Sequence, residues 1–74
     1  MNTDVKMNII VIDNYVVTNT KTGLNICPIR LAIKIHPTLN INSLKQITYG
    51  NKQEAAHILQ QLTNGSMNFE DLIT

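Results

Sequence analysis

The sequence predicts an α+β fold in which an antiparallel meander of three to four strands packs against one C-terminal α-helix, followed by a short terminal helical turn. Apolar and polar residues alternate over residues 26–36, as in a strand with one buried face. Apolar residues recur at helical spacing over residues 55–62. The 74 residues, of which 43% are hydrophobic, predict one small domain over residues 1–74.

The first strand-forming segment is Met7–Thr18, which is rich in Ile and Val. In its part Met7–Ile12, Met7, Ile9 and Val11 alternate with Ile10 and Ile12, so both faces of the strand carry apolar side chains. Asp13 and Asn14 interrupt the run. They form either a bulge in one long strand or a tight turn between two short ones.

Thr20–Gly23 is typical of a hairpin connection, with Gly23 able to adopt a positive φ. We therefore expect Tyr15–Asn19 and Asn25–Leu31 to be antiparallel neighbours.

The clearest strand prediction is Ile26–His36, which ends because Pro37 cannot continue a ladder. Pro28 has no N–H to donate, so this strand is expected to lie at an edge or to be irregular near its start. The predicted buried face carries Cys27, Ile29, Leu31, Ile33 and Ile35. The predicted solvent face carries Pro28, Arg30, Ala32, Lys34 and His36.

Pro37–Asn42 is predicted to be a loop, and Leu44–Tyr49 a further strand. The alternative is a short helical turn that starts at Ser43.

The helix is predicted to begin after Asn51, an N-cap with Glu54 three residues later, and to end at Gly65. Its apolar stripe is Ala55, Ile58, Leu59 and Leu62. Phe69, Leu72 and Ile73 repeat the helical spacing and predict the terminal turn, capped by Ser66 or Asn68. The expected core joins the Cys27 face of the long strand to this stripe and to the Phe69 cluster.

No catalytic, metal-binding or cofactor-binding constellation is predicted. Cys27 is the single cysteine, in phase with core aliphatics, which predicts a buried, inert thiol rather than a nucleophile paired with His36 or His57. The five acidic residues are scattered, and the three glycines are isolated turn residues rather than a phosphate-binding loop. We therefore expect a protein that is not an enzyme.

The net charge of +1 makes a dedicated nucleic-acid module less expected, because such modules are visibly basic. The longest unbroken apolar run, Ile9–Ile12, is far shorter than the roughly 20 residues of a membrane span. The first residues lack the features of a signal peptide. These observations predict a cytoplasmic protein, in the host cell if it is phage-encoded.

Two features are candidate partner-binding surfaces. Arg30, Lys34 and His36 alternate on the predicted solvent face, and cations two residues apart lie about 7 Å from one another at strand geometry. This face could contact phosphates or an acidic protein surface, or it could be a solvated face with edge-protecting charge. Ile10 and Ile12 must also contact something: the C-terminal segment, a second subunit or a target. Homodimerisation through Met7–Ile12 is our hypothesis for the second case.

The small size, the excess of Asn and Ile that AT-rich coding favours, and the meander-plus-helix layout look like those of phage or mobile-element accessory proteins. These include anti-CRISPR and other anti-defence inhibitors, which act by occluding a host protein's surface. The likeness is one of general character and covers no specific residue. The expected function is therefore a non-enzymatic interaction module that inhibits a host protein complex by stoichiometric binding. The alternative is a small dimeric nucleic-acid-binding regulator.

Overall fold

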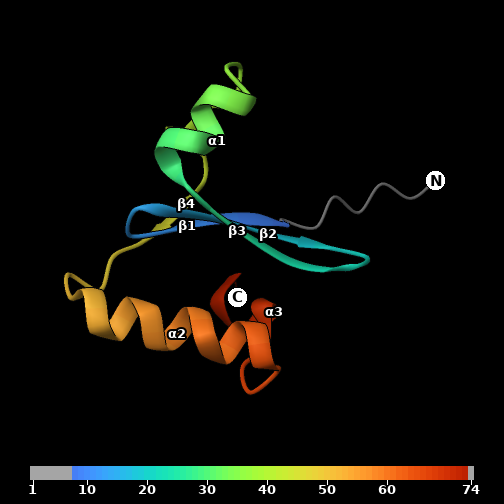
Figure 1. The fold of residues 1–74 in the computed structure, drawn as a ribbon, viewed down its shortest axis with the longest axis vertical. Helices are drawn as coiled ribbons and strands as arrows, with labels where there is room; N and C mark the ends of the chain where they lie inside the picture. Colours follow the sequence, from blue (N-terminus) through green and yellow to red (C-terminus); the bar gives the residue numbers. More distant parts are fainter. Residues whose placement is uncertain (1–7, 74) are drawn as a thin grey trace.

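A computed structural model describes residues 8–73 and confirms the α+β class. Figure 1 shows one sheet between two helical layers, with α1 on one side and α2 and α3 on the other. The elements are β1 Ile9–Ile12, β2 Tyr15–Thr20, β3 Gly23–Pro28, α1 Ile29–Ile35, the 3₁₀ helix η1 Ile41–Ser43, β4 Lys45–Ile47, α2 Lys52–Asn64 and α3 Phe69–Ile73.

The sheet is mixed, with the strand order β3-β2-β1-β4. The β1–β2 and β2–β3 pairs are antiparallel, as predicted, but β4 pairs with β1 in parallel, so the prediction of an all-antiparallel meander is wrong. The physical reason lies in residues 29–44, which form a crossover over one sheet face and return the chain beyond β1 in the original direction.

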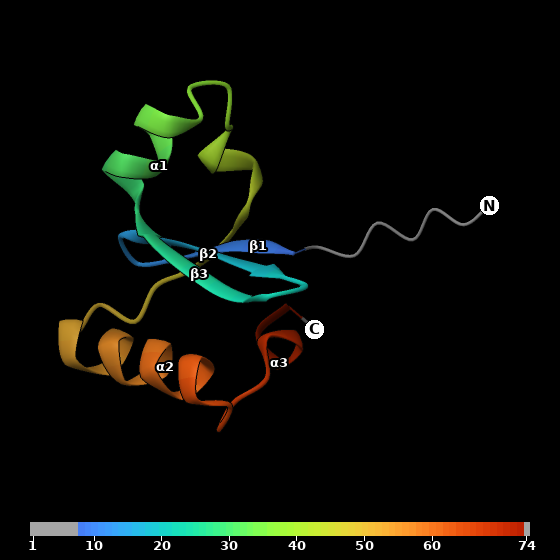
Figure 2. The ribbon, with the colours of Figure 1, turned by 45° about the vertical axis from the view of Figure 1, so that its right-hand side comes forward.

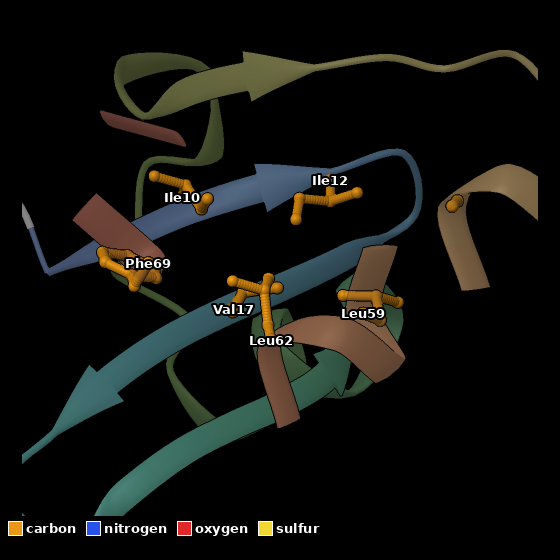
Figure 3. Packing of buried hydrophobic residues seen from close by; sticks show 7 residues of the cluster. Ile10, Ile12, Val17, Leu59, Leu62 and Phe69 are labelled. Carbon is orange, nitrogen blue, oxygen red and sulfur yellow. The ribbon is translucent and has the colours of Figure 1, made fainter. Parts of the chain in front are cut away.

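The two helical layers explain why β1 is apolar on both faces. Ile10 and Ile12 pack with α2 and α3 in one buried cluster, and Val11 packs with α1 in a second. Of the three alternatives for Ile10 and Ile12, the C-terminal segment is therefore the one that contacts them. Figure 3 shows both side chains beside Val17 and the apolar stripe of α2.

Both turn predictions are resolved by the strand registers. Asp13 and Asn14 form a tight turn between β1 and β2, because Ile12 pairs with Tyr15. The predicted hairpin at Thr20–Gly23 is confirmed, and Gly23 has a φ of 137°.

Residues 29–35 form a helix, so the prediction of one strand over Ile26–His36 is correct only as far as Pro28. The predicted pairing of residues 25–31 with β2 likewise stops at Pro28, opposite Tyr15. Pro28 lies on an edge strand, as predicted, and stands immediately before the first helical residue. The alternating pattern in this segment is also compatible with a helix that buries Ala32 and half-buries Ile29, three residues earlier.

In the second half of the chain, short sequence features predict where β4 and α2 form. The predicted strand over residues 44–49 is confirmed over Lys45–Ile47 as β4. The 3₁₀ helix η1 ends at Ser43, so the alternative of a helical turn that starts there is wrong. Asn51 caps α2: its side-chain oxygen accepts hydrogen bonds from the backbone N–H groups of Gln53 at 2.8 Å and Glu54 at 3.4 Å. Gly65 ends the helix with a φ of 86°.

The predicted core is wrong in two respects: Leu31, Ile33 and Ile35 are exposed, and the Cys27 side of the sheet does not pack against α2. The α2 stripe and Phe69 pack against the Ile10 face of the sheet, whereas half-buried Cys27 lies in the other cluster with Val11 and Val16. In Figure 2 the two helical layers remain on opposite sides of the sheet. No helix within residues 8–73 has both the length and the apolar content needed to cross a membrane.

Candidate interaction surface

Helix α1 attaches to the sheet by one narrow side. Ala32 is buried and packs in one cluster with Val11 and Val16, and Ile29 is half-buried beside them. The seven residues of α1 make about two turns, and Ile29 and Ala32, which pack against the sheet, lie within one of them, so most of the circumference of the helix faces outward.

The outward side of α1 is unusually apolar. Leu31, Ile33 and Ile35 are 47%, 46% and 57% exposed. They form three of the five exposed large hydrophobic residues in the described part of the chain, and all three come from this one helix. Isolated apolar side chains on a surface are ordinary, but a cluster on one short element marks a candidate contact surface.

Two cations lie between Ile33 and Leu31 around the circumference of the helix. Arg30 and Lys34 are exposed and lie one helical turn apart, so their Cβ atoms are about 5–6 Å from one another. They line a shallow depression together with Leu31 and Ile33. We call Arg30, Leu31, Ile33, Lys34 and Ile35 the α1 surface.

The structure brings the predicted cationic residues together in a different way. They were expected to alternate along a strand, whereas Arg30 and Lys34 follow helical spacing and His36 is the exposed residue at which α1 ends. Arg30 and Lys34 therefore lie close together because they are four residues apart in a helix, and not because they share one face of a strand.

The charge around the α1 surface has one sign. Residues 14–51 contain four Lys or Arg residues and no Asp or Glu. They include all of β2, β3, α1 and β4, while Glu54, Glu70 and Asp71 belong to α2 and α3 across the sheet. The net charge of +1 therefore averages a cationic part of the molecule around α1 with an acidic part in α2 and α3.

The other predicted partner-binding residues lie inside the protein. Ile10 and Ile12 are both 0% exposed, so a partner could reach them only by opening the core. Strands β2 and β4 occupy the two sides of β1, so Ile9–Ile12 has no free edge for a second subunit. Met7 lies outside the described residues.

Cys27 and His36 line one groove of about 720 Å³ between the sheet and α1. The groove has no carboxylate in its lining that could orient the histidine as a base. His57 is exposed on α2, on the opposite side of the sheet. Within residues 8–73 no group of three or more metal-ligating side chains is found.

A second groove, of about 690 Å³, lies between the β1–β2 turn and the start of α2. Asp13 is its one acidic lining residue, and Asp13 already accepts a hydrogen bond from the backbone of Tyr49. The pKa of Tyr49 is raised from its ordinary value of 10.0, chiefly by burial and further by the negative charges of Glu54 and Asp13. The hydrogen bond between Asp13 and Tyr49 joins the β1–β2 turn to the segment that follows β4.

Leu31, Ile33 and Ile35 were missed as surface residues because alternation assigned them to the core. The run without acidic residues over 14–51 was a signal in the sequence that pointed to a cationic side. Comparison of the chain with protein-family models, curated proteins and solved structures found no match.

Proposed function

We propose that this protein is an interaction module that binds another protein through the α1 surface. The observation that supports the proposal is the exposure of three large aliphatic side chains beside two cations on one seven-residue helix. The expected partner surface is an apolar groove bordered by carboxylates, which is the helix-in-groove mode of recognition.

The energetics of burial favour this site. Burying one fully exposed Leu or Ile side chain contributes about 1.5–3 kcal/mol, and the three on α1, which are about half exposed, can each contribute roughly half of that on binding. The buried Ala32 fixes the helix to the sheet before binding, so little ordering entropy remains to oppose association.

The specific form that we propose is stoichiometric inhibition of a host protein complex, as by anti-defence proteins of phages or mobile elements. Such an inhibitor needs a compact scaffold and one contact surface, without a reaction centre. The small size and composition of the chain support this form.

The test is a tagged pull-down from a bacterial host lysate, with and without nuclease, using wild-type protein and the double variant Leu31→Gln/Ile35→Gln. The control is His57→Gln/Gln60→Ala, which changes two exposed residues of α2. Circular dichroism checks that all three proteins are folded.

We expect wild type and the α2 control to recover one protein complex in near-stoichiometric yield regardless of nuclease, and the α1 variant to lose it. Equal recovery by both variants would overturn the role of the α1 surface. Recovery that disappears with nuclease would favour a nucleic-acid-binding regulator instead.

A further inference from the structure

The two edge strands of the sheet differ in how open they are. Strand β4 has three residues and carries Lys45, and its Gln46 Nε2 donates a hydrogen bond to the carbonyl oxygen of Ile41 in the preceding 3₁₀ helix at 2.8 Å. Strand β3 has six residues, Gly23–Pro28, without a charged side chain. It lacks the charges with which sheets usually protect their edges.

The backbone groups that β3 presents outward can be identified from the register. Asn19 pairs with Leu24, yet the N–H of Asn19 donates to the carbonyl of Asn8 at 2.8 Å, on the β1 side. The Asn19–Leu24 pair is therefore not hydrogen-bonded, and the N–H and C=O of Leu24 point away from β2. Hydrogen-bonded and non-hydrogen-bonded pairs alternate along an antiparallel ladder, so the N–H and C=O of Ile26 also point away from β2.

We propose that the free edge of β3 pairs with β3 of a second copy of this chain, in antiparallel orientation about a two-fold axis at Asn25. Leu24 of each copy then lies opposite Ile26 of the other. The two pairs use every outward N–H and C=O of these residues, in four hydrogen bonds. This self-complementarity is what a symmetric dimer requires.

Pro28 selects this register over the neighbouring one. With the axis at Ile26, Leu24 would lie opposite Pro28, which has no N–H, and the carbonyl of Leu24 would have no donor. With the axis at Asn25, the carbonyl of Leu24 accepts a hydrogen bond from the N–H of Ile26 in the other copy.

The side chains agree with the backbone. Leu24 is half-buried and packs against the cluster beneath α2, and Ile26, on the same sheet face, is 37% exposed. Pairing brings these apolar side chains together across the junction, where cross-strand aliphatic pairs add stability. The contact is independent of the α1 surface, so each proposal stands or fails alone.

The first test is the mass of the protein by sedimentation equilibrium over a range of concentrations. We expect the mass to rise from 8.3 kDa towards about twice that value. Ile26→Lys should hold the mass at the monomer value, because it places like charges across the junction. The control Ile33→Lys, on the α1 surface, should dimerise like wild type.

The second test fixes the register by a disulfide. At the axis the two Asn25 residues form a non-hydrogen-bonded pair with Cα atoms about 4.5 Å apart, within the range that a disulfide spans. In the Cys27→Ser background, Asn25→Cys should give a covalent dimer with oxidised glutathione, which takes two electrons and two protons from the two thiols. Lys21→Cys in the same background should remain monomeric.

A mass of 8.3 kDa at every concentration would overturn the proposal. So would a dimer that Ile33→Lys abolishes and Ile26→Lys does not, since that association would use α1. A covalent dimer from Lys21→Cys but none from Asn25→Cys would overturn the axis at Asn25.

Discussion

Asp13 Oδ1 accepts a hydrogen bond from the backbone N–H of Tyr49 at 3.1 Å, across 36 positions of sequence. The backbone N–H of Asp13 in turn donates to the carbonyl of Ile47 at 2.9 Å. Asp13 therefore connects the β1–β2 turn to the end of the parallel strand β4 by two hydrogen bonds. Asp13 does so with a φ of 51°, the single positive φ of a non-glycine residue within residues 8–73.

Replacing Asp13 should show the combined contribution of its side-chain hydrogen bond and its backbone conformation to stability. Asp13→Ala loses the acceptor and keeps an unfavourable φ, so we expect a loss of about 1–3 kcal/mol in the free energy of unfolding. Asp13→Asn keeps an acceptor and tolerates positive φ, and should lose less. Urea denaturation measures both, and equal losses would contradict a role for the side-chain bond.

Charge substitutions in α1 should distinguish the helix from the alternating strand. Ala32→Lys forces a charge into the cluster with Val11 and Val16 and should destabilise the fold strongly. Ile33→Lys replaces an exposed side chain and should change the unfolding free energy by no more than about 0.5 kcal/mol. A strand over residues 26–36 predicts the reverse order, which thermal or urea unfolding would reveal.

Two isoleucines of similar sequence context should differ sharply in their contribution to stability. Ile12→Ala removes a side chain that is 0% exposed and should cost about 2–5 kcal/mol. Ile35→Ala acts at a side chain that is 57% exposed and should cost far less. Comparable losses in urea denaturation would contradict the assignment of Ile35 to the surface.

Tyr49 should make the protein less stable in alkali. Its pKa is raised in the folded state by burial, so above about pH 10 the unfolded chain releases the phenol proton first. The folded state then binds more protons than the unfolded state, and the unfolding free energy falls as pH rises.

The measurement is the urea midpoint at pH 8, 10 and 11 for wild type, Tyr49→Phe and the control Tyr15→Phe. We expect a smaller decline for Tyr49→Phe than for the other two proteins. Parallel declines in all three would show that Tyr49 does not account for the alkaline loss.

The elements that the sequence predicted correctly carry their signals locally. The cap at Asn51, the stop at Gly65 and the hairpin at Gly23 depend on side chains and φ values within a few residues. Helix α2 and the β2–β3 hairpin could therefore be placed without knowing what they contact.

The failures concern long-range packing. The apolar pattern of residues 29–35 fits a strand with a period of two, and it also fits a helix with one narrow buried side. Packing of Ala32 against the sheet accompanies the helix, and this contact cannot be read from the local sequence. The parallel direction of β4 likewise depends on the path of the crossover rather than on Lys45–Ile47 itself. The cationic candidates Arg30 and Lys34 could be named from sequence, but their aliphatic neighbours could not be recognised as exposed.

The α1 surface exists only if residues 29–35 are helical. The most direct measurement is the set of backbone Cα chemical shifts of these residues by nuclear magnetic resonance on the free protein in solution. We predict positive deviations from random-coil values across residues 29–35, after negative deviations in β3. Negative deviations continuing through residue 35 would restore the long strand, return Leu31, Ile33 and Ile35 to a sheet face, and remove the proposed surface.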